Sequence, residues 1–126
     1  MPVLAVVPDL YFATRIAATA KAAGVALELV SRERAAARVA EPNASLVLLD
    51  LHGPGALALV GELKAAAPAV PVVGFFSHVQ ASMRRDALAA GADAALPRSQ
   101  FVAKLQPLLV RGLDALAPGA PGELRL

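Results

Sequence analysis

Short apolar runs alternate with longer, alanine-rich segments along most of the chain. The apolar runs cover residues 3–7, 25–30, 45–50, 70–76 and 94–96, and segments of helical composition cover 11–23, 34–39, 56–67, 79–90 and about 99–116. The third run, SLVLLD, is apolar from Leu46 to Leu49, which is typical of a strand buried on both faces. Five strand-then-helix units in succession predict a parallel sheet with helices on both sides.

Glycine and small polar residues mark the ends of the predicted helices. Gly24 and Gly91 follow helical segments, where a glycine commonly ends a helix. Ser31 and Ser99 stand where an N-cap is expected, because a hydroxyl there accepts a hydrogen bond from an unpaired backbone N–H. With right-handed crossovers, the pattern predicts one three-layer α/β/α domain over residues 1–116, with a five-stranded parallel sheet in the flavodoxin-like order 2-1-3-4-5. Residues 117–126, rich in proline and glycine, are expected to form a flexible tail.

Two carboxylates fall where a sheet of this kind places its ligands. Such ligands bind beyond the carboxyl ends of the strands, at the switch point between the first and third strands. Asp9 follows the first predicted strand and Asp50 ends the third, so we expect the fold to bring them to the same edge. Both also have structural interpretations. Asp9 can cap the first helix, and Asp50 can accept backbone hydrogen bonds in a turn.

Composition narrows the classes of function. The chain has 126 residues, 57% of them hydrophobic, which is enough for one domain with a full core. It has no cysteine, so disulfides and thiolate chemistry are excluded. The first residues do not resemble a signal peptide, and no charge-free run approaches the roughly 20 residues of a membrane helix. We expect a soluble, cytoplasmic protein that does not bind membranes.

The basic residues do not indicate nucleic-acid binding. The formal net charge is +2, and arginines gather at 32, 34 and 38 and again at 84–85. A nucleic-acid site would need a basic stripe with a recognition motif or stacking aromatics, and aromatics make up only 4% of the chain. The arginines are therefore predicted to lie on solvated helix faces.

Three stretches carry a family resemblance: SLVLLDLHGPG at 45–55, VPVV at 70–73 and ALAAGADAALPRS at 87–99. Through them the chain, over most of its length, resembles the receiver domains of bacterial two-component response regulators. The resemblance implies that Asp50, with Pro54 four residues later, accepts a phosphoryl group in a reaction that uses Mg²⁺ to bring two anions together. It also implies a signalling module and not an enzyme.

The implied metal site lacks one acid. By the resemblance, Mg²⁺ would be held by Asp9, Asp50 and the backbone carbonyl of His52. Receivers carry an acidic pair after the first strand, where this chain has Pro8–Asp9. We therefore expect metal binding to be weakened.

The remaining receiver positions are also altered. The phosphate-binding hydroxyl at the end of the fourth strand corresponds to Phe76, or to Ser77 if the register shifts by one residue. The lysine after the fifth strand corresponds to Arg98, which keeps the charge but not the geometry, and the aromatic switch corresponds to Ala95. A further hypothesis is that Phe76 fills the pocket that the hydroxyl normally lines and so blocks the switch.

We therefore predict a stand-alone pseudo-receiver that acts by protein–protein contact, with phosphorylation of Asp50 weakened or lost. The alternative is a phosphorylatable, Mg²⁺-dependent atypical receiver. The resemblance implies a histidine kinase or a downstream signalling protein as the partner, and leaves a homodimer open. The implied contact face is the fourth helix, fifth strand and fifth helix, which carry Arg84, Arg85, Arg98 and Gln100.

Two remote alternatives concern the same loop. Asp50, His52 and Gly55 match the Asp-x-His-x-x-Gly motif of cobalamin-binding domains, in which the aspartate orients the cobalt-ligating imidazole. That motif follows the first strand of its domain, whereas here it follows the third. His52 and His78 could also share a metal with Asp9 and Asp50. Hydrolytic chemistry has little support, because no nucleophile, base and acid are arranged as a triad.

Overall fold

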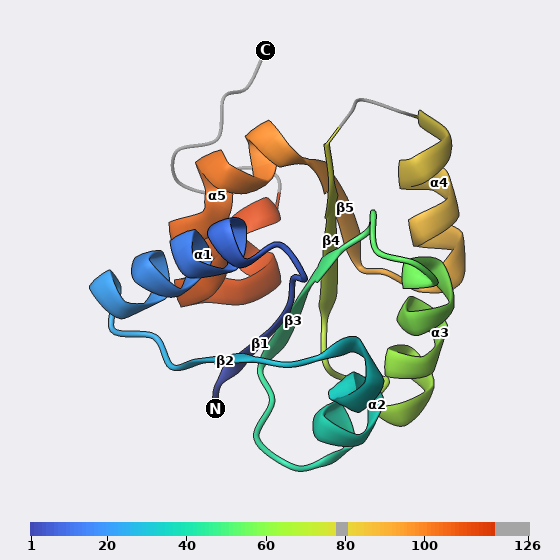
Figure 1. The fold of residues 1–126 in the computed structure, drawn as a ribbon, viewed down its shortest axis with the longest axis horizontal. Helices are drawn as coiled ribbons and strands as arrows, with labels where there is room; N and C mark the ends of the chain where they lie inside the picture. Colours follow the sequence, from blue (N-terminus) through green and yellow to red (C-terminus); the bar gives the residue numbers. More distant parts are fainter. Residues whose placement is uncertain (78–80, 118–126) are drawn as a thin grey trace.

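The computed structural model describes residues 1–77 and 81–117. Strands and helices alternate along the chain, as predicted (Figure 1). In chain order they are β1 (Val3–Val6), α1 (Leu10–Ala22), β2 (Leu27–Leu29), α2 (Arg32–Ala40), β3 (Leu46–Asp50), α3 (Ala56–Ala66), β4 (Val72–Phe76), α4 (Ala81–Ala90), β5 (Ala94–Pro97), α5 (Arg98–Arg111) and the 3₁₀ helix η1 (Gly112–Leu116).

The five strands form one parallel sheet in the order β2-β1-β3-β4-β5, which confirms the predicted topology. Figure 1 shows α1 and α5 on one side of the sheet and α2, α3 and α4 on the other. The register pairs Val6 with Leu49 and Asp50 with Phe75. The carboxyl ends of β1 and β3 therefore lie side by side.

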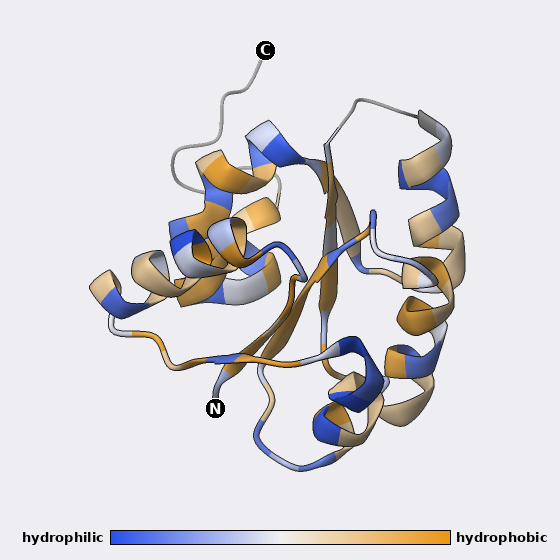
Figure 2. Ribbon diagram, viewed as in Figure 1, coloured by the Kyte–Doolittle hydropathy of each residue, from blue (hydrophilic) through white to orange (hydrophobic). Residues whose placement is uncertain are grey.

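Each face of the sheet has its own apolar core, and the inner strands β1, β3 and β4 are mostly hydrophobic (Figure 2). Under α2, α3 and α4, alternate strand residues such as Leu49 and Phe76 pack against Leu59 and Val60 of α3. Under α1 and α5, the rings of Phe75 and Phe101 stack with centroids 4.4 Å apart, and the Phe12 ring lies 5.1 Å from that of Phe75. Burial of each such side chain contributes roughly 1.5–3 kcal/mol.

The last predicted helix differs from the observed one at both ends. It was expected to begin at the Ser99 cap and to run to about residue 116. Instead α5 begins at Arg98, because Pro97 is held in an extended conformation at the N-cap (φ −56°, ψ 147°). It ends at Arg111, because Gly112 has a φ of 62°, and the chain continues as η1.

The predicted second strand is longer than the observed one, and two other predicted segments lie partly outside the described residues. β2 is shorter than the predicted strand at 25–30, because the Val25 N–H is bonded to the Ala20 carbonyl at the end of α1. The predicted tail lies outside the described residues except for Ala117, and so do the first two residues of the predicted helix at 79–90. Within the ranges that the structure describes, no helix is long and apolar enough to cross a membrane.

Candidate functional site at the carboxyl edge of the sheet

Asp50 is the last residue of β3 and is partly buried. Its Oδ1 accepts a hydrogen bond from the backbone N–H of His52 at 2.9 Å, so the carboxylate orders the turn that follows the strand. This geometry confirms the turn interpretation of Asp50. This hydrogen bond uses only Oδ1 of the carboxylate and does not test phosphorylation. The role of Asp50 as phosphoacceptor therefore stays a prediction.

Asp9 lies at the neighbouring strand end and is held by two contacts. Its Oδ1 caps α1 by accepting a hydrogen bond from the Phe12 N–H at 3.2 Å, which confirms the predicted N-cap. Its Oδ2 lies 3.6 Å from an Nη2 nitrogen of Arg98. Both oxygens of this predicted metal ligand are therefore engaged by the protein itself.

Arg98 reaches Asp9 from the first residue of α5. Its guanidinium also lies 4.0 Å from the centroid of the Phe12 ring, in a cation–π arrangement. Phe12 is buried, so its ring forms a fixed platform for the guanidinium. The side chain that replaces the receiver lysine thus places a positive charge beside Asp9.

The donor groups at this edge fit Mg²⁺ poorly. Hard divalent cations require several oxygen ligands, preferably carboxylates. Among residues 1–77 and 81–117, no three His, Cys, Asp or Glu side chains gather closely enough to hold a metal ion. Both oxygens of Asp9 already contact other groups of the protein, and Pro8 stands where receivers carry the other acid of the pair. A site at Asp9, Asp50 and the His52 carbonyl stays a prediction.

Strand alternation separates Phe76 from Asp50. Phe76 is 2% exposed and packs in the core under α2, α3 and α4. Asp50 pairs with Phe75, which packs in the opposite core, under α1 and α5. Since side chains alternate along a strand, Ser77 and not Phe76 is the next position on the face of Asp50. The placement therefore gives no support to the hypothesis that Phe76 fills a pocket beside Asp50.

Ser77 makes a contact that the sequence did not predict. Its backbone N–H donates a hydrogen bond to Nε2 of His52 at 2.7 Å. The ring nitrogen that accepts this bond carries no hydrogen in this arrangement. This bond joins the loop after β3 to the end of β4. It occupies one of the two ring nitrogens through which His52 could bind a metal. His78, the other predicted metal ligand, lies outside the described residues.

Arg32 holds the other side of the same loop. From the first turn of α2, its Nη1 donates a hydrogen bond to the Pro54 carbonyl. The next residue, Gly55, has a φ of 68°, and a Cβ built there would overlap the Arg32 guanidinium. In the sequence, Gly53-Pro54-Gly55 indicates a turn here but does not indicate its contact with Arg32. The loop from His52 to Gly55 is thus bonded on both sides.

Solved receiver domains share this architecture. The receiver domain of the Francisella response regulator 1452 superposes with a TM-score of 0.72 at 17% identity, over 87% of this chain and 97% of that one. The orphan response regulator HP1043 of H. pylori gives a TM-score of 0.74 at 19% identity, over 93% and 97%. NtrX from Brucella abortus, solved in complex with ADP, gives 0.77 at 23% identity, over 90% of this chain and 27% of that one.

No family model matches the sequence, and no curated protein sequence matches it either. The structural similarity is nevertheless close over nearly the whole chain. The chain therefore has the fold of response-regulator receiver domains, which confirms the resemblance inferred from the sequence.

Proposed function

We propose that this chain is a receiver-like signalling module that acts through protein–protein contact and not as an enzyme, with phosphorylation of Asp50 weakened or lost. The observation that carries this proposal is the state of Asp9. Its carboxylate caps α1 through Phe12 and faces the guanidinium of Arg98.

Phosphoryl transfer to a carboxylate brings two anions together, and a divalent cation normally neutralises them. In this chain the positive charge beside Asp9 comes from Arg98, which is anchored on the Phe12 ring. A cation entering the site would compete with Arg98 for Oδ2, the Asp9 oxygen that does not cap α1. That competition disfavours metal binding and, with it, transfer of a phosphoryl group to Asp50.

The loops around Asp50 are also bonded to each other. The His52–Ser77 hydrogen bond ties the loop after β3 to the end of β4, and Arg32 holds the loop at Pro54. A switch needs two arrangements of a loop that its signal can bias. These bonds favour one arrangement, which supports a module read by its partners in a single state.

The proposed partner, by resemblance to receivers, is a histidine kinase or a downstream signalling protein that contacts α4, β5 and α5. Arg84, Arg85 and Gln100 are exposed on these elements. Arg98, predicted for the same face, is turned instead toward Asp9 and Phe12. A homodimer through this face is the second possibility for a partner.

A phosphorylatable receiver is the alternative function. Two observations favour it: Asp50 ends β3 at the carboxyl edge of the sheet, and Ser77 follows on the same face of β4. Under this alternative, Ser77 would supply the hydroxyl that binds the phosphoryl group, and Arg98 would leave Asp9 to contact it.

Intact-mass analysis distinguishes the two functions. The wild-type chain and Asp50→Asn are each incubated with acetyl phosphate and Mg²⁺. We expect neither protein to gain the mass of a phosphoryl group. An adduct on the wild type that is absent from Asp50→Asn would overturn the pseudo-receiver proposal and establish the alternative.

A further inference from the structure

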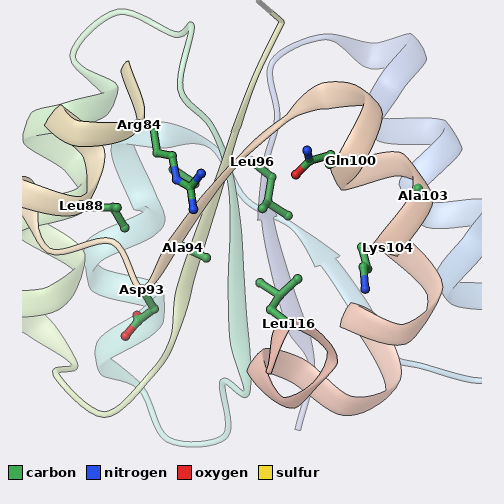
Figure 3. Close-up of a pocket in the computed structure, with 10 residues that line it drawn as sticks. Arg84, Leu88, Asp93, Ala94, Leu96, Gln100, Ala103, Lys104 and Leu116 are labelled. Atoms are coloured by element: carbon green, nitrogen blue, oxygen red, sulfur yellow. The ribbon is translucent and has the colours of Figure 1, made fainter. Parts of the chain in front are cut away.

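A groove runs between α4 and α5, with the edge strand β5 as its floor (Figure 3). Its volume is about 430 Å³. In the close-up, Arg84 and Leu88 stand on one side and Gln100 and Lys104 on the other, with Leu96 between them and Leu116 of η1 near one end. Four consecutive elements, α4, β5, α5 and η1, therefore form one concave surface.

The interior of the groove is apolar. Ala94 and Ala103 have short side chains, which leaves room above the strand. Leu96 and Leu116 line the groove and are partly exposed, and Leu88 on the rim is 42% exposed. Apolar surface that stays in contact with water is costly, and a concave patch of this kind is a common place for a partner to bind.

The charge of the groove is positive. Arg84 and Lys104 line its two walls. Asp93 is the one carboxylate among the described residues that line it. It accepts hydrogen bonds from Lys64 Nζ at 2.9 Å and from the Val72 N–H at 2.8 Å, so its charge is already compensated. An occupant therefore meets two cationic side chains and no free carboxylate.

We propose that the groove binds an acidic, amphipathic segment of a partner protein. Apolar side chains of that segment would pack on Leu88, Leu96 and Leu116, while its carboxylates would pair with Arg84 and Lys104. The inference rests on the proposed function, because it names the chemistry of the partner that such a module would recognise. A second copy of the chain is the less favoured occupant, because its matching surface carries the same excess of positive charge.

The test selects displayed random peptides on the full chain and measures the winners by fluorescence anisotropy. We expect selected peptides to combine Asp or Glu with large apolar residues. The double variant Arg84→Glu/Lys104→Glu should weaken their binding by about tenfold or more, because it would place like charges against each other across the interface. Leu88→Ser should also weaken it. The matched control, Arg15→Glu/Lys21→Glu, reverses two exposed basic residues on α1 and should leave affinity unchanged.

Thermal melting of each variant checks that the fold is kept, and Leu88→Ser tests the groove without altering its charge. Selection of neutral or basic peptides, failure to select any peptide, or equal weakening by the α1 control would overturn the inference. Phosphoryl labelling of Asp50 is scored separately. Labelling would remove the pseudo-receiver proposal while leaving a groove-specific peptide result in force.

Discussion

The imidazole of His52 accepts a hydrogen bond from the backbone N–H of Ser77 at 2.7 Å. The backbone N–H of His52 itself donates to the carboxylate of Asp50, two residues earlier in the chain. The two bonds form a chain from the end of β3 to the end of β4. Replacing His52 with alanine removes the acceptor for Ser77, at a cost of about 0.5–1.5 kcal/mol in the free energy of unfolding.

This prediction is checked by hydrogen exchange at the Ser77 amide. We expect exchange at Ser77 to be faster in His52→Ala than in the wild type, while amides inside β3 are unchanged. His52→Gln is the matched control, because its side-chain oxygen can still accept a hydrogen bond. Equal protection of Ser77 in the wild type and His52→Ala would show that the bond does not hold the loop.

Arg98 contacts Asp9 and Phe12 at the carboxyl edge, and we predict that it keeps metal away from Asp9. Arg98→Ala removes the ion pair with Asp9 and the cation–π contact with Phe12, which together contribute about 1 kcal/mol at a site this exposed. It also removes the positive charge beside Asp9. We expect the melting temperature of Arg98→Ala to rise with added Mg²⁺, while that of the wild type does not.

Arg98→Lys is the control for charge, because lysine keeps the positive charge but not the planar contact with Phe12. Its melting temperature should rise with Mg²⁺ less than that of Arg98→Ala, because the positive charge is kept beside Asp9. A wild-type chain whose melting temperature rises with Mg²⁺ as strongly as that of Arg98→Ala would contradict the interpretation of Asp9 given above.

Gly55 is required by its backbone conformation. Its φ of 68° is unfavourable for other residues, whereas the Arg32 guanidinium that a Cβ would meet is the end of a flexible side chain and can shift. Gly55→Ala is expected to destabilise the protein by at least about 1 kcal/mol. Gly61→Ala is the matched control, because Gly61 lies inside α3 with open space around it. That change should stabilise the protein by about 0.5–1 kcal/mol. Urea denaturation measures both, and effects of the same sign would refute the argument.

Asp93 joins α3, β4 and the start of β5. Its Oδ2 accepts hydrogen bonds from Lys64 and from the Val72 N–H. We expect Asp93→Ala to lower the free energy of unfolding by about 1–3 kcal/mol, because the backbone donor loses its partner. Asp86→Ala, which breaks only the exposed pair with Arg85, should change it by less than about 0.5 kcal/mol. Similar losses in the two variants would argue against a special role for Asp93.

The apolar pattern was enough to predict the sheet. The predicted bounds 45–50 and 70–76 differ from those of β3 and β4 by at most two residues. A strand covered on both faces is a continuous apolar run, so the limits of the run mark the limits of the strand. The end of the last helix was not predicted. Its leucines continue to Leu116 with helical spacing, and only the φ of Gly112 shows that the helix has ended.

The candidate site was predicted in part. Asp9 and Asp50 could be placed at neighbouring strand ends, because parallel topology fixes which edge each strand end occupies. The contacts of Arg98 with Phe12 and of His52 with Ser77 could not be predicted. They depend on side-chain directions across elements that are distant in sequence, and a pattern of residue types carries no signal for those directions.

The position of η1 has a practical consequence for anyone who labels this protein. Leu116 lines the groove, so the chain leaves the described fold at Ala117 beside the proposed docking surface. A fluorophore, affinity tag or reporter inserted at Ala117 would begin beside Leu116, which lines the groove, and would crowd whatever binds there. Met1 precedes β1, which β3 and β4 separate from β5. Attachment at Met1 therefore leaves the groove clear for binding assays.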